Sequence, residues 1–108
     1  TRNKDLQGLY ACNASTSVGA LQGLQSQKRS EVKMIGFDAE KALLDGLKAG
    51  QIDALVVQNP FKMGYEGVKA VALKLKGEAV AKRIDTGVEV ITKARLDEPA
   101  IKELLKGQ

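Results

Sequence analysis

The sequence predicts an α/β protein in which a parallel sheet is layered with helices. Three observations lead to this fold class. Short continuous apolar runs recur along the chain, helical patterns with apolar stripes lie between them, and connections are short. Strand starts recur about every 20–25 residues, which suits a right-handed strand–helix–strand crossover. The predicted order is therefore β-α-β-α-β-α-β-α in a Rossmann-like or flavodoxin-like layered sheet.

Four segments have the pattern of strands. The first three span residues 8–12, 32–37 and 54–57. Each of these is continuously apolar, which is typical of strands covered on both faces in a parallel sheet. Residues 86–92 alternate instead. Val88 and Val90 fall on one face and Glu89 on the other, which predicts a half-exposed strand at or near an edge.

The first two helices are predicted from apolar positions at helical spacing. One covers residues 15–28, and both Asn13 and Ser15 suit its N-cap. Its apolar positions are Val18, Leu21 and Leu24. The other starts after Asp38, which is also a good N-cap, and ends at Gly50. Its apolar stripe consists of Ala39, Leu43 and Leu47.

The third helix has the clearest start. Asn59 is its N-cap, and Pro60 takes the first helical position, where the missing N–H costs nothing. Its apolar stripe consists of Phe61, Gly64, Val68, Val71, Ala72 and Leu75. Gly77 ends this helix. A final helix begins near residues 97–99 and carries Ile101, Leu104 and Leu105.

The composition argues against catalysis and against a metal or cofactor site. The chain has no His and a single cysteine, Cys12, which is expected to be a small buried residue in the first strand. A Cys–His nucleophile and a cysteine-based zinc site are therefore excluded. Neither a G-x-S-x-G elbow nor a phosphate-binding Walker motif is present. We therefore expect no enzyme, no cofactor and no metal.

The charge pattern and hydropathy exclude two further classes. The net charge of +4 is spread along the chain and aromatic residues are 4% of the total, so no nucleic-acid surface is expected. No apolar run approaches the roughly 20 residues needed to span a bilayer. The chain opens on the polar residues 1–5, which are not a signal peptide.

Short polar residues follow three predicted strands. Asn13 follows the first strand, Asp38 the second, and Gln58 with Asn59 the third. In open α/β sheets, ligands bind beyond the carboxyl ends of the strands. Amides offer donors and acceptors, and a carboxylate accepts two hydrogen bonds, as the vicinal hydroxyls of a sugar require. Helix capping would also explain Asp38 and Asn59 individually.

Several motifs resemble one known family, the type I periplasmic sugar-binding proteins. They are residues 8–13, 18–21, 35–38, 53–60, 63–65 and 83–88. The similarity is greatest to the C-terminal part of ribose-binding-protein-like receptors of bacterial ABC importers. It covers nearly the whole chain in order and spacing. The family often has an acidic residue directly after its asparagine, where this chain has Ala14.

The resemblance implies a role for named residues. In the family, two α/β lobes close over a sugar, and the matching positions that bind its hydroxyls are Asn13, Asp38 and Gln58. Asn59, Asp85 and Thr86 match the hinge where the chain crosses between lobes. Residues 1–58 then belong to the C-terminal lobe, residues 59–82 form a crossover whose helix belongs to the N-terminal lobe, and residues 83–108 are the return strand and terminal helix.

The resemblance also implies partners and a location. A family member has close to three times this length, so an N-terminal lobe, on the same or a separate chain, would complete the site. The function implied is capture of a monosaccharide, a ribose-like pentose or a hexose, for an ABC permease in the membrane. The family works in the periplasm or, lipid-anchored, outside a Gram-positive cell. The isolated segment is expected to associate with itself, swap elements or require the missing part.

Two other functions remain open at this point. The effector domain of a LacI-type repressor shares the fold, and a helix-turn-helix upstream of residue 1 would identify it, whereas a signal peptide or lipobox there would identify a receptor. The segments 59–65 and 83–87 favour the receptor. A free-standing flavodoxin-like or receiver module is the third hypothesis, and binding of a flavin or of acetyl phosphate would support it.

Overall fold

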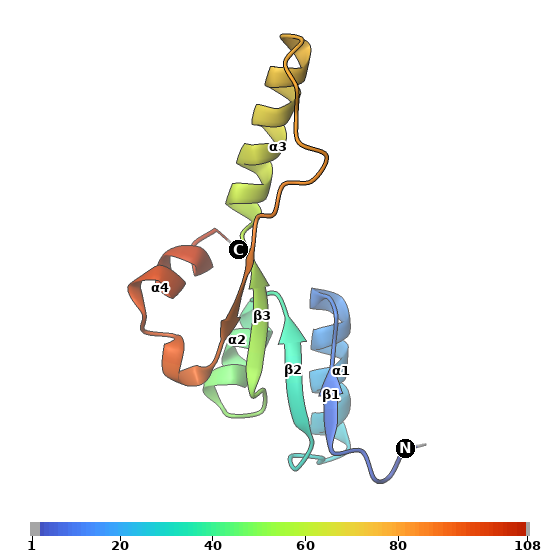
Figure 1. Ribbon diagram of the computed structural model, residues 1–108. Helices are drawn as coiled ribbons and strands as arrows, with labels where there is room; N and C mark the ends of the chain where they lie inside the picture. Colours follow the sequence, from blue (N-terminus) through green and yellow to red (C-terminus); the bar gives the residue numbers. More distant parts are fainter. Residues whose placement is uncertain (1–2, 108) are drawn as a thin grey trace.

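Four strands form one sheet, in the order β1-β2-β3-β4, in the computed structural model of the chain, which describes residues 3–107. The strands are β1 (Gly8–Tyr10), β2 (Lys33–Phe37), β3 (Ala54–Gln58) and β4 (Val88–Ile91). β1, β2 and β3 run parallel, and β4 pairs antiparallel with β3. The predicted α/β layered sheet with alternating strands and helices is confirmed (Figure 1).

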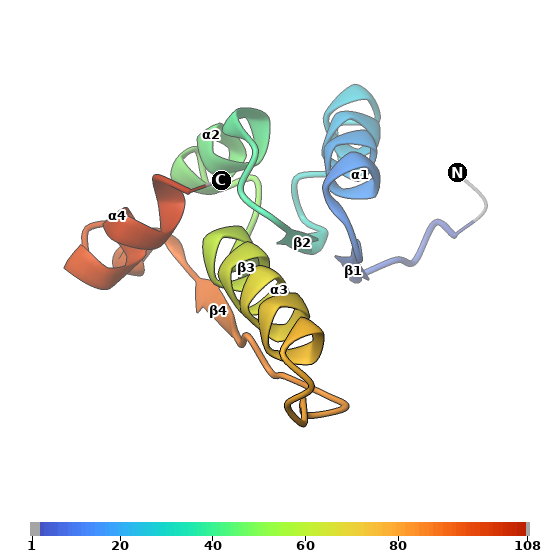
Figure 2. The same ribbon diagram turned by 90° about the horizontal axis from the view of Figure 1, so that it is seen from above.

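Two helices cover one face of the sheet. They are α1 (Ala14–Ser26) and α2 (Lys41–Lys48), seen on the same side in Figure 2. Right-handed crossovers that advance in one direction place their helices on one face, which explains this arrangement. α4 (Pro99–Leu105) follows a short 3₁₀ turn (Lys93–Arg95) and lies beside α2. α3 (Pro60–Leu75) extends away from the sheet (Figure 1).

β4 runs against the other strands because α3 does not fold back along the sheet. The chain leaves the carboxyl end of β3 through α3 and returns to that same end (Figure 1). The register pairs Gln58 with Val88. The sequence of residues 86–92 predicted a half-exposed strand at or near an edge. The edge position is confirmed, but Val88, Glu89 and Val90 are all exposed and only Ile91 is buried.

The core lies between the sheet and the helices that cover it. Its side chains are at most 4% exposed and include Leu21, Met34, Leu43, Leu47, Leu55, Val57, Ile91 and Ile101. Full burial of each such side chain contributes roughly 1.5–3 kcal/mol. The core therefore fixes the sheet and the two crossover helices, and with them the loops at the carboxyl ends of the strands.

Local signals set the start of α3 and the ends of α2 and α3 as the sequence predicted. The side chain of Asn59 accepts a 2.9 Å hydrogen bond from the backbone N–H of Lys62, and Pro60 is the first residue of α3. Gly50 and Gly77 follow α2 and α3 with φ of +77°. That left-handed conformation costs glycine little, because glycine has no Cβ.

The prediction that Asp38 caps the second helix is wrong. α2 begins at Lys41, and its N-cap residue is Glu40, whose side chain makes no capping hydrogen bond. Asp38 has a φ of +67° and its N–H donates to the carbonyl of Val56 at 2.8 Å. The left-handed backbone turns the chain at the end of β2, so that the helix starts further along.

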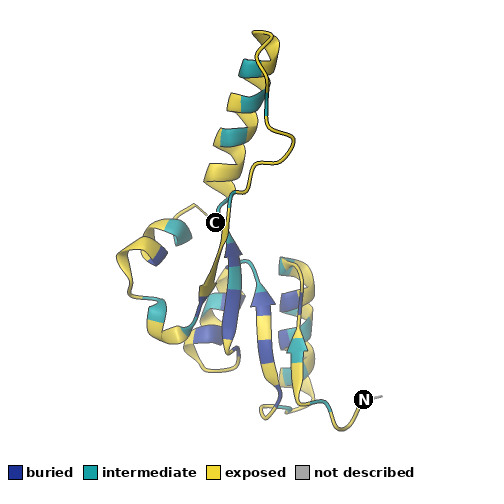
Figure 3. Cartoon of the chain, viewed as in Figure 1, coloured by how far each residue is buried: buried dark blue, intermediate teal, exposed yellow. Residues whose placement is uncertain are grey.

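The first strand is more exposed than its apolar sequence predicted. Tyr10 is 58% exposed, and its partner in β2, Ile35, is 40% exposed (Figure 3). Cys12 was expected to be buried within the strand, but it is exposed and lies beyond the end of β1. Among residues 3–107, helices cover only the opposite face of β1 and β2, which explains the error.

α3 projects as an arm, and none of its described residues is buried. Its predicted apolar stripe lies in solvent, from Phe61, 78% exposed, to Leu75, 84% exposed (Figure 3). The arm gives the chain a radius of gyration of 17.3 Å. A compact domain of this length would have a radius of gyration near 13 Å.

Candidate functional site

The carboxyl ends of β1, β2 and β3 meet at the edge of the sheet from which α3 departs (Figure 1). Gln58 is the last residue of β3, and Asp38 follows β2 directly. Asn13 follows β1 and precedes α1. The three polar residues predicted from the sequence therefore lie at neighbouring strand ends, because parallel strands bring their carboxyl ends to one edge.

Asp38 and Gln58 are in direct contact. The Gln58 Nε2 group donates a 3.0 Å hydrogen bond to Asp38 Oδ1, and both residues are half-buried. The backbone of Asp38 is held by Val56, at 2.8 Å, in its left-handed conformation. A non-glycine residue in this region stores strain, and such residues concentrate at binding sites. The pair presents a carboxylate whose position is fixed from both sides.

An open groove of about 910 Å³ contains this pair. Its walls come from the start of α1, the start of α2 and the start of α3, and they include Ala14, Glu40, Lys41, Leu44, Pro60 and Met63. No motif or spacing marks the last five as groove residues, because their placement depends on how the helices meet, α4 included through Leu105. The groove combines a carboxylate and an amide with apolar surface, as small-molecule sites do.

The rim of the groove carries an ion pair on the exposed surface of α2. Lys41 Nζ lies 2.5 Å from Asp45 Oδ2. The hydrogen bond from Lys41 holds the pKa of Asp45 below its ordinary value, and the same bond raises the pKa of Lys41. Both groups are therefore charged at neutral pH and largely cancel each other's charge beside the groove.

Asn13 acts as the N-cap of α1. Its Oδ1 accepts hydrogen bonds from the Thr16 N–H and the Thr16 hydroxyl, both at 2.9 Å, and from the Ser15 hydroxyl at 3.1 Å. Asn13 rather than Ser15 is thus the cap. Asn13 follows β1, the strand next to β2, but it does not line the groove that contains Asp38 and Gln58. Of the three predicted sugar ligands, the structure brings Asp38 and Gln58 into contact with each other.

One residue beneath these loops was missed by the sequence analysis. Ser17 is fully buried, and its hydroxyl bonds the carbonyl of Asn13 at 2.7 Å and the N–H of Phe37 at 2.8 Å. A serine in a helix next to apolar positions carries no motif, so only the tertiary structure reveals these contacts.

The predicted hinge residues lie where the chain enters and leaves the arm. Asn59 caps α3. Asp85 Oδ1 accepts a 2.8 Å hydrogen bond from the N–H of Gly87, whose φ is +74°. Asn59 and Thr86 line the same small pocket, so the outgoing and returning segments are adjacent. Their role as a hinge stays a prediction.

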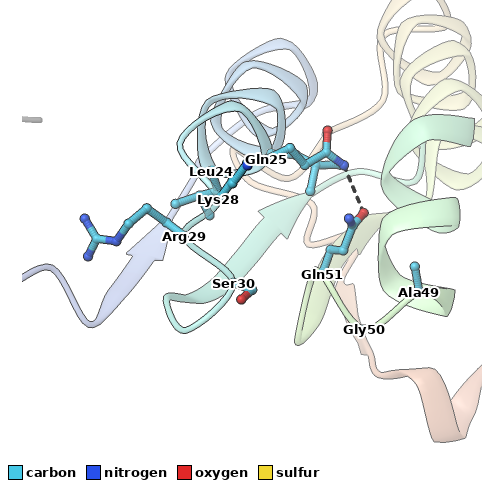
Figure 4. Close-up of a pocket in the computed structure, with 9 residues that line it drawn as sticks. Leu24, Gln25, Lys28, Arg29, Ser30, Ala49, Gly50 and Gln51 are labelled. Carbon is cyan, nitrogen blue, oxygen red and sulfur yellow. Dashed lines mark hydrogen bonds between the residues drawn. The ribbon is translucent and has the colours of Figure 1, made fainter.

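A second groove, of about 410 Å³, lies at the opposite edge of the sheet (Figure 4). There Gln25 Nε2 donates a 2.9 Å hydrogen bond to Gln51 Oε1, which joins the end of α1 to the loop after α2. Arg29 in its wall donates to the carbonyl of Leu6 at 3.1 Å and pairs with Glu31. These contacts hold loops together, so the candidate site remains at the carboxyl edge.

In the part of the chain that the structure describes, no group of three or more His, Cys, Asp or Glu side chains is placed to hold a metal ion. No helix within residues 3–107 is both long and apolar enough to cross a membrane.

Known proteins resemble this chain in sequence and in structure. A family model described as a periplasmic binding protein domain matches residues 1–79. The ribose import binding protein of Escherichia coli (strain K12) is 33% identical over 97 residues, which are 86% of this chain and 31% of that protein. The chain thus spans about a third of the length of this curated relative.

Two solved structures superpose on nearly the whole chain. One is a carbohydrate transporter solute binding protein from Agrobacterium radiobacter in complex with D-arabinose, with a TM-score of 0.87, 40% identity and coverage of 95% of this chain and 35% of that one. The other is an ABC transporter solute binding protein from Agrobacterium vitis bound with α-D-tagatopyranose, with a TM-score of 0.89, 35% identity and the same coverage. The sequence, the layered fold and these structures agree, and the chain belongs to the periplasmic binding protein domain family.

Proposed function

We propose that this chain is the C-terminal part of a solute receptor that captures a monosaccharide, a ribose-like pentose or a hexose, for uptake by an ABC transporter. The observation that carries the proposal is the Asp38–Gln58 pair in the groove at the carboxyl edge of the sheet. The role is binding without catalysis.

The chemistry of the pair fits sugar hydroxyls. Gln58 donates to one carboxylate oxygen of Asp38 and so orients the group. An oriented carboxylate accepts hydrogen bonds from two neighbouring hydroxyls, and each such charge-assisted bond is worth roughly 1.5–3 kcal/mol. Asn13 lies at the next strand end, where its amide would reach a further hydroxyl. These three residues are the proposed sugar ligands.

The relatives support this substrate class. The relative from Escherichia coli is named a ribose import binding protein, and the two solved structures hold D-arabinose and α-D-tagatopyranose. All three ligands are monosaccharides with vicinal hydroxyls. Because all three proteins are binding or import proteins, a receptor is favoured over the effector domain of a LacI-type repressor.

We further propose the division of the chain suggested by its sequence. Residues 1–58 belong to one lobe, residues 59–82 cross to the other lobe, and residues 83–108 return. The exposed α3 arm supports this division, because its apolar stripe has no covering element among the described residues. A contiguous exposed apolar surface normally marks an interface. The proposed partner is the remaining lobe of the receptor, on the same or a separate chain.

The receptor is proposed to work outside the cytoplasmic membrane, in the periplasm or lipid-anchored on a Gram-positive cell. There it would deliver its sugar to an ABC permease. The named relatives belong to import systems of this kind, which supports the location.

A titration of the complete natural gene product tests the proposal. The protein is titrated calorimetrically with D-ribose, D-arabinose and a set of hexoses, with glycerol as a control that has hydroxyls but no ring. At least one monosaccharide should bind at micromolar concentration or below, and glycerol should not. A complete protein that binds no monosaccharide at millimolar concentration would refute the function.

A further inference from the structure

Ser17 is the one buried polar side chain in the described part of the chain, with 0% of its surface exposed. A buried hydroxyl costs free energy unless it is hydrogen-bonded, so its partners explain why the fold tolerates it. The Ser17 hydroxyl donates to the carbonyl of Asn13 at 2.7 Å and accepts from the N–H of Phe37 at 2.8 Å. One oxygen atom therefore joins the loop after β1 to the end of β2.

The first of these contacts is local, and the second is not. A helical serine often bonds the carbonyl four residues earlier, which accounts for Asn13. Phe37 is 20 residues away in the chain. A 3.0 Å hydrogen bond from the Ala11 N–H to the Ile35 carbonyl joins the segment after β1 to β2. Two residues further along β2, the N–H of Phe37 donates to the Ser17 hydroxyl. The hydroxyl thus continues the connection between the two segments past the end of β1.

The surroundings of Ser17 leave little freedom for this link to shift. A Cβ added at Gly36 would lie 2.9 Å from Leu55 Cδ2 and 3.3 Å from Ser17 Oγ. Close packing of this kind transmits a displacement to its neighbours. The two segments that Ser17 joins carry two proposed sugar ligands, since Asn13 is itself bonded and Asp38 directly follows Phe37.

From these contacts we infer that Ser17 is a positioning residue for sugar binding. Its hydroxyl fixes the separation of the Asn13 and Asp38 loops, and so matches the spacing of these two ligands to the spacing of hydroxyls on a sugar ring. The inference rests on the proposed function. Ser17 itself is fully buried and does not line the groove, so it acts only through the two loops.

The test compares Ser17→Ala with Ser26→Ala in the complete receptor. Ser26 is a matched control on the same helix, where its exposed hydroxyl bonds the carbonyl of Gly23 at 3.0 Å. Ser17→Ala should weaken binding of the sugar that the wild type binds by about threefold to tenfold, the worth of one neutral hydrogen bond. Ser26→Ala should leave the affinity unchanged.

A double-mutant cycle separates positioning from general destabilisation. If Ser17 acts by placing Asp38, the effect of Ser17→Ala on affinity should shrink or vanish in an Asp38→Ala background, because the group it positions is gone. Hydrogen exchange at the Phe37 amide should also accelerate in Ser17→Ala. Unchanged affinity, or effects that add in the double mutant, would overturn the inference. A wild type that binds no sugar would instead overturn the proposed function.

Discussion

Gln58 Nε2 lies 3.0 Å from Asp38 Oδ1, and this hydrogen bond ties the end of β3 to the end of β2. The contact spans 20 residues of sequence and holds the carboxylate at the groove. An oriented charged acceptor contributes more to binding than a mobile one, since less side-chain freedom is lost when the ligand arrives. Asp38 is therefore expected to be the strongest hydrogen-bonding group of this half of the site.

Replacing Asp38 with alanine in the complete receptor should weaken sugar binding about tenfold to a thousandfold. This range corresponds to the loss of one or two charge-assisted hydrogen bonds. Calorimetric titration measures the change. Asp53→Ala is the control, because this carboxylate bonds Met34 and Lys33 away from the groove and should leave affinity unchanged. Unaltered affinity in Asp38→Ala would leave the residue a structural one only.

The hinge prediction concerns the two places where the chain passes into and out of the arm. If Asn59 and Asp85 lie at lobe crossings, their backbone angles should differ between the sugar-free and sugar-bound forms of the complete receptor. Gly87, with its φ of +74°, follows Thr86 and gives the returning segment extra freedom. Structures of both forms measure the angles. If all these residues lay within one rigid unit in both forms, the crossing would have to be elsewhere.

Asp53 should make the stability of the receptor depend on pH in the acid range. Burial raises its pKa, but the N–H of Met34 and the ammonium of Lys33 outweigh burial and hold the pKa below its ordinary value of 3.8. A lowered folded-state pKa gives stability that is present above the unfolded pKa and is lost as the pH falls through the folded one. The stabilisation should therefore begin to decline below about pH 4 and be lost only once the pH falls below the lowered pKa of the folded state.

Asp53→Asn provides the measurement. At pH 7 it should lower the free energy of unfolding by about 1 kcal/mol, because the carboxylate is 41% exposed and its bonds are partly screened. At pH 3 the difference from wild type should narrow. Urea unfolding of the wild type and the variant at both pH values tests this. If the difference in unfolding free energy between wild type and Asp53→Asn were the same at pH 3 as at pH 7, the lowered pKa of Asp53 would be contradicted.

The sequence predicted those features of the fold that depend on neighbouring residues. The start of α3 follows from Asn59 and Pro60, and its end from Gly77, because capping and left-handed glycine are local effects. The strand ends and hence the positions of Asp38 and Gln58 followed from apolar runs. The layered order was predictable because alternating strands and helices permit few topologies.

Other features depend on contacts that a single sequence does not contain. Asp38 looked like a helix cap, but its left-handed backbone moves the start of α2 to Lys41. The role of Ser17 could not be predicted, because its second hydrogen-bond partner, Phe37, is 20 residues away in the chain. Tyr10 was expected to be buried because its strand is apolar, but among the described residues no helix covers that face of the sheet. Effects of neighbouring residues could thus be predicted from the sequence, whereas contacts between residues far apart in the chain could not.

The exposed arm should make the isolated chain associate with itself. The apolar stripe from Phe61 to Leu75 is a continuous surface in solvent, and burying it in a second copy would release water. Light scattering at several concentrations should show dimers or larger species. Val68→Glu should shift the population toward monomer, whereas Lys69→Glu, an exposed neighbour on the same helix, should not. A chain that stays monomeric throughout would show that the stripe is tolerated in water.

The isolated chain should bind a monosaccharide no better than about millimolar. Only one wall of the proposed site is present, and its groove is open, so water competes for each hydrogen bond and reduces a neutral contact to about 0.5–1.5 kcal/mol. Contacts from Asn13, Asp38 and Gln58, less the cost of immobilising the sugar, leave less than the roughly 4 kcal/mol that a millimolar complex requires. Titrating the isolated chain and the complete receptor with the same sugar measures the contribution of the second wall directly. A monomeric isolated chain that bound the sugar at micromolar concentration would mean that these residues form a sufficient site by themselves.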